Sequence, residues 1–336
     1  MSPKEHILSI RKNYTGEDSD INAAGENVVS HLTEMLTIAI KELAKNIYQK
    51  DSHFIMELIQ NADDNDYGVK VEPFLKITLA ETKVIVENNE KGFDKRNVEA
   101  ICKIGKSTKS LQNGSKGYIG EKGIGFKSVF RISNEPHIYS NGYRFKFKTS
   151  ENKKLNTIEL GYILPEWLEE TDNEVNSGLT TIVLPYRKKM SGEEKAKIKD
   201  IHPTLLLFLN KLTRLEIEDR EDSRKFFFRK ERRKQTIRLY KDIYSGSDCY
   251  SSVQDFFIIE RKGIAVPKSA RVDQRSDATE TKIILSFPLN QNGDLNFTDE
   301  QYVYAFLPVR KYGFRFLIQA DFILTSGRES IDEDSL

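Results

Sequence analysis

Two stretches of the sequence carry most of the information about the fold: residues 52–66, SHFIMELIQNADDND, and residues 117–130, GYIGEKGIGFKSVF. The first stretch predicts an amphipathic helix, because its apolar residues recur at intervals of three and four. These apolar residues are Ile55, Leu58, Ile59 and Ala62. We therefore expect a helix from about residue 52 to residue 66, with this face turned toward a core.

The same helix carries a polar stripe formed by Glu57, Asn61 and Asp64. At helical spacing these three side chains lie within about 60° of one another. A carboxylate next to a carboxamide can orient a water molecule and can hold a hard cation through oxygen. The alternative interpretation is an ordinary solvated helix face.

The second stretch is rich in glycine and runs into an apolar helical pattern that begins near Phe126. Glycines allow backbone N–H groups to approach phosphate oxygens closely, and a helix N-terminus favours negative charge. The alternative is a tight turn with linker glycines. The stretch is neither a dinucleotide-binding fingerprint nor a Walker A loop, because it lacks the preceding strand of the first and the GK[ST] ending of the second.

The rest of the chain predicts a mixed α/β protein. Residues 26–49 have helical periodicity, and residues 74–80 and 83–87 alternate like the strands of a hairpin. Asp94 is a plausible N-cap, and Ser191 with Glu194 forms a capping box before a helix expected to end near residue 212. Strands are also expected at 136–140, 143–148, 157–163, 179–184 and 213–218, and residues after about 220 are mostly β.

Composition excludes several classes of protein. The 336 residues carry 52 Lys and Arg against 51 Asp and Glu, so no whole-chain charge favours nucleic acid or membrane. No apolar run has the length of a signal peptide or of a membrane span. Two cysteines cannot build a disulfide scaffold. These features predict an intracellular protein, cytoplasmic or nuclear, and the polar ending after residue 325 suggests a part of a longer chain.

Five motifs in order resemble those of the GHKL ATPase superfamily, which includes gyrase B, the ninety-kilodalton heat-shock chaperone, histidine kinases and MutL. The motifs are ELIQNADD at 57–64, NNEKGF at 88–93, IGKSTK at 104–109, GEKGIGFKS at 120–128 and GLTTIVL at 178–184. Their wording is most similar to the sacsin and No-vein branch. The resemblance covers roughly residues 26–218.

The resemblance implies ATP and Mg²⁺ as cofactors and a role for each matching residue. Glu57 would be the general base, and Asn61 would ligand Mg²⁺. Lys106 would reach the nucleotide from a lid, and Thr181 would support the floor of the adenine pocket. The other matching positions would surround the nucleotide: Asp64, Asn88, Gly92, Ser107, Thr108, Gly120, Gly123, Gly125, Phe126 and Lys127.

Asn88 departs from the superfamily pattern, which has an aspartate that accepts a hydrogen bond from the adenine amino group. An amide oxygen can accept the same bond but carries no charge. We therefore expect weaker selectivity for adenine than for the phosphates.

The resemblance also implies the fold class and the domains. We expect an α+β protein: a flexible segment over residues 1–25, then a two-layer α/β sandwich of the Bergerat type over 26–220. A mostly β second domain over 221–336 would resemble the start of the chaperone's middle domain. Arg328, in TSGRE at 325–329, matches an arginine that reaches the γ-phosphate in that family.

These implications predict a slow, Mg²⁺-dependent ATPase that drives lid closure and domain docking within a larger chaperone-like protein. Protein clients and an ATP-dependent dimer are the expected partners. One alternative is a nucleic-acid-associated ATPase of the MutL or MORC type, since residues 224–234 carry seven basic residues and three phenylalanines. A solvated basic hairpin explains this run better in a chain of balanced charge. A nucleotide-binding scaffold with little hydrolysis is the other alternative.

Overall fold

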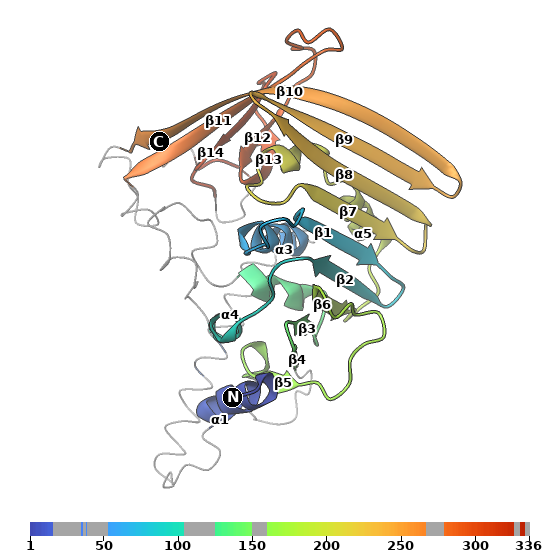
Figure 1. Ribbon diagram of the computed structural model, residues 1–336, viewed down its shortest axis with the longest axis vertical. Coiled ribbons are helices and arrows are strands. Elements are labelled where there is room, and N and C mark those ends of the chain that lie inside the picture. The colour runs from blue at the N-terminus through green and yellow to red at the C-terminus, as the bar shows by residue number, and fades with distance from the viewer. Residues whose placement is uncertain are drawn as a thin grey trace.

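The computed structural model describes residues 1–15, 35, 38, 53–103, 125–149, 160–266, 279–325 and 330–332. These residues form one mixed sheet of fourteen strands with helices packed against it (Figure 1). The helices are α1 (Pro3–Thr15), α3 (His53–Asp64), α4 (Lys95–Ile101) and α5 (Gly192–Lys199), with 3-10 helices η3 (Gly125–Arg131), η4 (Leu160–Tyr162) and η5 (Pro203–Leu207). The first strands are β1 (Phe74–Leu79), β2 (Lys83–Asn88), β3 (His137–Ser140), β4 (Tyr143–Phe147), β5 (Pro165–Trp167), β6 (Thr180–Pro185) and β7 (Arg214–Asp219). The remaining strands are β8 (Arg224–Arg233), β9 (Thr236–Ser245), β10 (Asp248–Ala265), β11 (Glu280–Pro288), β12 (Tyr302–Ala305), β13 (Leu307–Lys311) and β14 (Leu317–Ala320).

The predicted two-layer α/β sandwich followed by a mostly β domain is wrong. The strand order is β13-β12-β14-β11-β10-β9-β8-β7-β1-β2-β6-β3-β4-β5, so strands from both sides of residue 220 belong to one sheet. The reason is β7, which pairs with β1 in parallel and with β8 antiparallel. Because a free strand edge offers unpaired N–H and C=O groups, β8 continues the ladder and no linker separates two units there.

The parts of the chain before and after residue 220 also share one core. Ile55 and Leu58 of α3 belong to the same buried apolar cluster as Phe228 of β8 and Tyr304 of β12. Figure 1 shows β8, β9 and β10 as long neighbouring strands, with α3 near the start of β1 and the end of β2. A side chain in this cluster gains roughly 1.5–3 kcal/mol on burial, so the apolar face predicted for α3 is what attaches the helix to the sheet.

Local signals predicted several elements correctly. The β1–β2 hairpin is antiparallel, and Asn141 and Gly142 connect β3 to β4 with positive φ angles of 48° and 81°. Asp94 caps α4 through a capping box with Asn97, and the predicted box of Ser191 and Glu194 begins α5. These signals depend only on residues a few positions apart, which is why a sequence pattern is sufficient for them.

Other elements differ from expectation. The helix after Ser191 ends at Lys199 instead of near residue 212, because Pro203 cannot continue a helix and starts η5. Residues 160–162 form η4 instead of a strand. Residues 3–15, expected to be flexible, form α1 with Ile7 and Ile10 buried. The helix predicted over 26–49 lies outside the described residues, apart from 35 and 38.

Lys127 lies inside the core. Its ammonium donates to the carbonyl oxygens of Ile101 and Tyr162, each at 2.6 Å, and lies 4.3 Å from the centre of the Phe147 ring. Ile101 is the last residue of α4, where a cation is favoured by the helix dipole. Burial nevertheless lowers the pKa of Lys127 to about 8.

The buried lysine predicts a pH-dependent stability. Below about pH 8 the ammonium is charged in both the folded and the unfolded chain, whereas between about 8 and 10.5 only the unfolded chain holds the proton. Raising the pH through this window therefore stabilises the folded state. We expect the free energy of unfolding of the parent, relative to Lys127→Met, to increase by about 2 kcal/mol between pH 7 and pH 9.5.

Urea unfolding at the two pH values measures this difference, and taking the difference between parent and variant cancels all other titrating groups. The exposed Lys103→Met variant is the control and should show no such change. A parent-to-variant difference that is the same at both pH values would contradict the burial of a titrating amine at this position.

Candidate functional site

The first feature of the site is the contact between α3 and η3, which brings the two quoted stretches of sequence together. Glu57 is only 8% exposed, and a Cβ atom placed on Gly125 would lie 2.3 Å from its Oε2 atom. A larger residue at position 125 would displace the end of the Glu57 side chain from this place. The predicted general base thus lies directly against the backbone that ends the glycine-rich stretch.

Asn61 and Asp64 follow Glu57 on the same side of α3, and both are half-buried. Their spacing of four and three residues stacks the three side chains along one stripe of the helix. An amide oxygen flanked by two carboxylates is an oxygen-only donor set, of the kind that suits Mg²⁺ when waters and a ligand complete the coordination.

The second feature is a row of polar side chains on the face of the sheet against which α3 packs. Asn88 pairs with Thr180 across β2 and β6, and Ser140 of β3 lies beside Thr180. The Ser140 and Thr180 hydroxyls are 2.6 Å apart, and the Phe93 N–H donates to Ser140 Oγ at 2.8 Å. All three side chains are buried at the end of a sheet face that is otherwise apolar.

The turn after β2 is fixed against this row. The Glu90 N–H donates to Asn88 Oδ1 at 3.2 Å, and Asn141 donates to the Phe93 carbonyl at 3.1 Å. Gly92 has a φ of +88°, and a Cβ there would lie 2.6 Å from the Cβ of Asn141. Both facts require glycine, so the NNEKGF stretch has a conformation that its sequence specifies.

Thr181 does not belong to this row. Successive residues of a strand point to opposite faces, and Thr181 shares its face with Ile85, Tyr139 and Val183. Its hydroxyl is buried and has no hydrogen-bond partner among the described residues. The residue that faces α3 is Thr180, which together with Ser140 was missed from the sequence. The signal for both residues is the two-residue period of the strands, which places Thr180 on the same face as Ile182 and Ser140 on the same face as Ile138.

The remaining predicted residues divide into two groups. Phe126 and Lys127 are described and pack in the core around Phe147. Lys106, Ser107, Thr108, Gly120, Gly123 and Arg328 lie outside the described residues.

Cys102 is unsuited to act as a nucleophile. Cys102 is buried, and burial raises the pKa of its thiol to about 12. A thiol that stays protonated at neutral pH is a poor nucleophile. In the part of the chain that the structure describes, no group of three or more His, Cys, Asp or Glu side chains could hold a metal ion.

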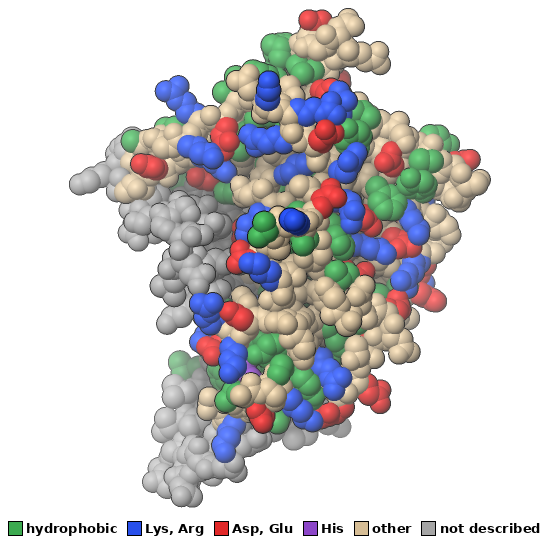
Figure 2. Space-filling view, viewed as in Figure 1, with side chains coloured by type: hydrophobic (Ala, Val, Ile, Leu, Met, Phe, Trp, Pro, Cys, Tyr) green, Lys and Arg blue, Asp and Glu red, His purple; other side chains and the backbone are tan. Residues whose placement is uncertain are grey.

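The basic run at 224–234 lies on β8 among acidic partners. Its ion pairs are Lys225 with Glu218, Arg232 with Glu260 and Arg233 with Glu231. Figure 2 shows Lys and Arg side chains interspersed with Asp and Glu side chains over the side of the molecule in view. Because the neighbouring carboxylates compensate the charge, this distribution favours a solvated surface over a nucleic-acid stripe.

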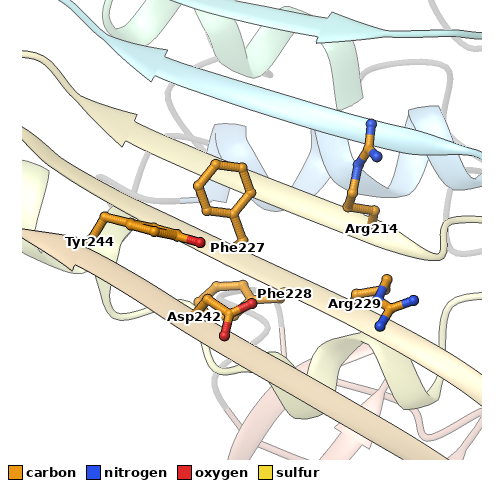
Figure 3. A pocket seen from close by; sticks show the side chains of 6 residues that line it. All are labelled: Arg214, Phe227, Phe228, Arg229, Asp242 and Tyr244. Carbon is orange, nitrogen blue, oxygen red and sulfur yellow. The ribbon is translucent and has the colours of Figure 1, made fainter. Parts of the chain in front are cut away.

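A hollow of about 210 Å³ opens on the same face (Figure 3). It is lined by Arg214, Phe227, Phe228, Arg229, Asp242 and Tyr244. Arg214 already stacks on Phe74 and pairs with Glu216, and Arg229 stacks on Tyr240 at 4.2 Å. The arginines are therefore partly used within the protein, and this hollow is a weaker candidate than the surroundings of Glu57.

Among the helices that the structure describes, none combines the length and the apolar composition needed to cross a membrane.

No protein-family model matches the chain. The chain is similar to Protein NO VEIN of Arabidopsis thaliana, with 38% identity over 351 aligned positions. The alignment covers 98% of this chain but 12% of that protein, so the chain spans about an eighth of the length of its relative. This similarity along nearly the whole chain supports the No-vein-like branch of the resemblance that the motifs indicate.

Proposed function

We propose that this chain binds Mg-ATP and hydrolyses it slowly, as the ATPase module of a larger chaperone-like protein, with a nucleotide site of the GHKL type. The single observation that carries the proposal is the contact of the Glu57 carboxylate with Gly125. It joins a buried carboxylate to the backbone of the glycine-rich stretch, an arrangement that suits a general base acting on water next to a phosphate.

Each residue has a defined task in this proposal. Glu57 accepts the proton of the attacking water, and its contact with Gly125 keeps the carboxylate directed at the glycine-rich backbone. Backbone N–H groups of that stretch hold phosphate oxygens. The Asn61 side-chain oxygen holds Mg²⁺, which when bound neutralises charge on the phosphates.

The adenine base of the nucleotide would contact the polar row formed by Asn88, Thr180 and Ser140. Among these three side chains, the serine and threonine hydroxyls bond to each other, and Asn88 Oδ1 accepts the Glu90 N–H. These bonds hold the side chains of the row in one orientation before a ligand arrives, which reduces the entropy lost on binding.

Calorimetry with ATP, ADP and GTP, each with Mg²⁺ and with EDTA, tests which nucleotide binds and whether binding depends on the metal. Absence of ATP binding in both conditions would refute the proposal.

Removing the general base should abolish hydrolysis and leave binding intact. We expect Glu57→Ala to lower kcat by about 10²–10⁴-fold, because the carboxylate acts on the water and not on the nucleotide. Gly125→Ala should have nearly the same effect, since its Cβ occupies the place of Oε2 and displaces the carboxylate.

Steady-state hydrolysis and ATP titration of both variants measure this. Gly192→Ala, where a Cβ meets nothing within 4 Å, is the matched control. If Gly125→Ala hydrolyses ATP at the parent's rate, the contact between the two stretches has no catalytic role.

Two neighbouring threonines provide a test of the polar row that is proposed to bind adenine. We expect Thr180→Val to weaken ATP binding by about tenfold, because it removes the hydroxyl that pairs with Ser140 and faces the proposed site. Thr181→Val should bind ATP like the parent. Its free energy of unfolding should be unchanged or higher, since the lost hydroxyl is buried without a partner among the described residues.

Titration and thermal unfolding of the two variants separate these effects. Equal loss of affinity in both variants would show that the two faces of β6 do not differ in function.

A further inference from the structure

The last turn of α3 is tied to residues 210–212 by hydrogen bonds that run in both directions. The Asp63 carboxylate accepts the backbone N–H groups of Asn210, Lys211 and Leu212 at 2.7, 2.8 and 2.8 Å. In return, the Lys211 ammonium donates to the carbonyl oxygens of Asp64 at 3.1 Å and Asn65 at 2.6 Å. We call this set of contacts the α3 lock.

The loop that forms the lock is held from its other side by β8. The Lys230 ammonium donates to the carbonyl oxygens of Leu206 at 2.9 Å and Leu209 at 2.5 Å. Asp63 and Lys230 thus bind the same short segment through opposite kinds of backbone group. The Asp63 carboxylate accepts hydrogen bonds from its N–H groups, and the Lys230 ammonium donates to its carbonyl oxygens. The segment has little freedom to shift, so it is a fixed reference for α3.

Asp63 itself cannot touch a ligand on the stripe of Glu57, Asn61 and Asp64. It follows Asn61 by two residues, which places the two side chains about 200° apart around the helix. Asp63 is also only 4% exposed. What Asp63 determines is the rotation of the last turn about the helix axis, and that rotation sets where Asn61 and Asp64 point.

The chemistry of the position also calls for an explanation. A carboxylate near the C-terminus of a helix is disfavoured by the helix dipole, and burying it costs free energy unless several hydrogen bonds compensate. An apolar side chain could attach the helix at lower cost. A carboxylate that accepts three directed N–H groups fixes orientation far more tightly than apolar packing does.

We propose that Asp63 is a positioning residue, which through the α3 lock holds Asn61 and Asp64 in the orientation that binds Mg²⁺ with the nucleotide. This inference rests on the proposed nucleotide function. It adds that the segment before β7, rather than α3 alone, determines the metal-dependent part of the affinity.

The test measures the ATP dissociation constant with Mg²⁺ and with EDTA for the parent, Asp63→Asn and Lys211→Met. The ratio of the two constants is the gain in affinity from Mg²⁺. We expect this gain to fall about tenfold in Asp63→Asn, and by a smaller factor in Lys211→Met, while the constant in EDTA stays within about threefold of the parent. Asp200→Asn, an exposed carboxylate at the end of α5, is the control and should keep the full gain.

Titration stoichiometry separates positioning from stability. A purely structural role would lower the fraction of molecules that bind and leave the constants of the folded molecules unchanged, and this result would overturn the inference. Lys211→Met changes an exposed side chain, so it remains informative if Asp63→Asn does not fold. If the parent binds ATP and both variants keep its Mg²⁺ gain, only the inference fails; if the parent does not bind ATP, the proposed function fails and the inference fails with it.

Discussion

The fold depends on the hydrogen bonds that the Asp63 carboxylate accepts from residues 210–212. These bonds fix the point at which the chain enters β7, since Thr213 donates directly to the Pro73 carbonyl next to β1. β7 then pairs with β1 in parallel and offers its other edge to β8. A carboxylate left in this place without the three N–H groups would cost several kcal/mol. The buried carboxylate therefore depends on the backbone segment that leads into β7.

The buried ammonium groups have the complementary task. Lys230 holds carbonyl oxygens of the segment before the lock, and burial lowers its pKa to about 8 while the Asp63 carboxylate acts in the opposite direction. The Lys127 ammonium likewise donates to a backbone carbonyl oxygen, that of Ile101 at the end of α4. Both lysines satisfy backbone acceptors, and buried acceptors without a partner cost about 1–3 kcal/mol each.

The sequence could predict what depends on near neighbours and missed what depends on distant ones. The apolar face of α3, the β1–β2 hairpin and the capping boxes follow from periods and spacings of a few residues, and the structure has all of them. The single sheet could not be foreseen, because the parallel pairing of β1 with β7 joins residues more than a hundred positions apart, and no local pattern records it. Thr181, the residue that the motif resemblance implies for the adenine pocket, lies on the opposite face of β6 from Asn88. The two-residue period of a strand is the local signal that separates it from Thr180, which shares the face of Asn88.

The glycines of the candidate site show how two explanations can be separated. Glycine-rich stretches are commonly attributed to close approach of a phosphate, but Gly125 and Gly92 already have reasons within the protein. The first makes room for the Glu57 carboxylate, and the second turns with positive φ against Asn141. Neither glycine is therefore evidence for a phosphate by itself. What distinguishes a site from a tight turn is that one of these glycines admits an ionisable carboxylate to the backbone. In the proposed hydrolysis that carboxylate takes the proton of the attacking water, a role that a structural turn does not need.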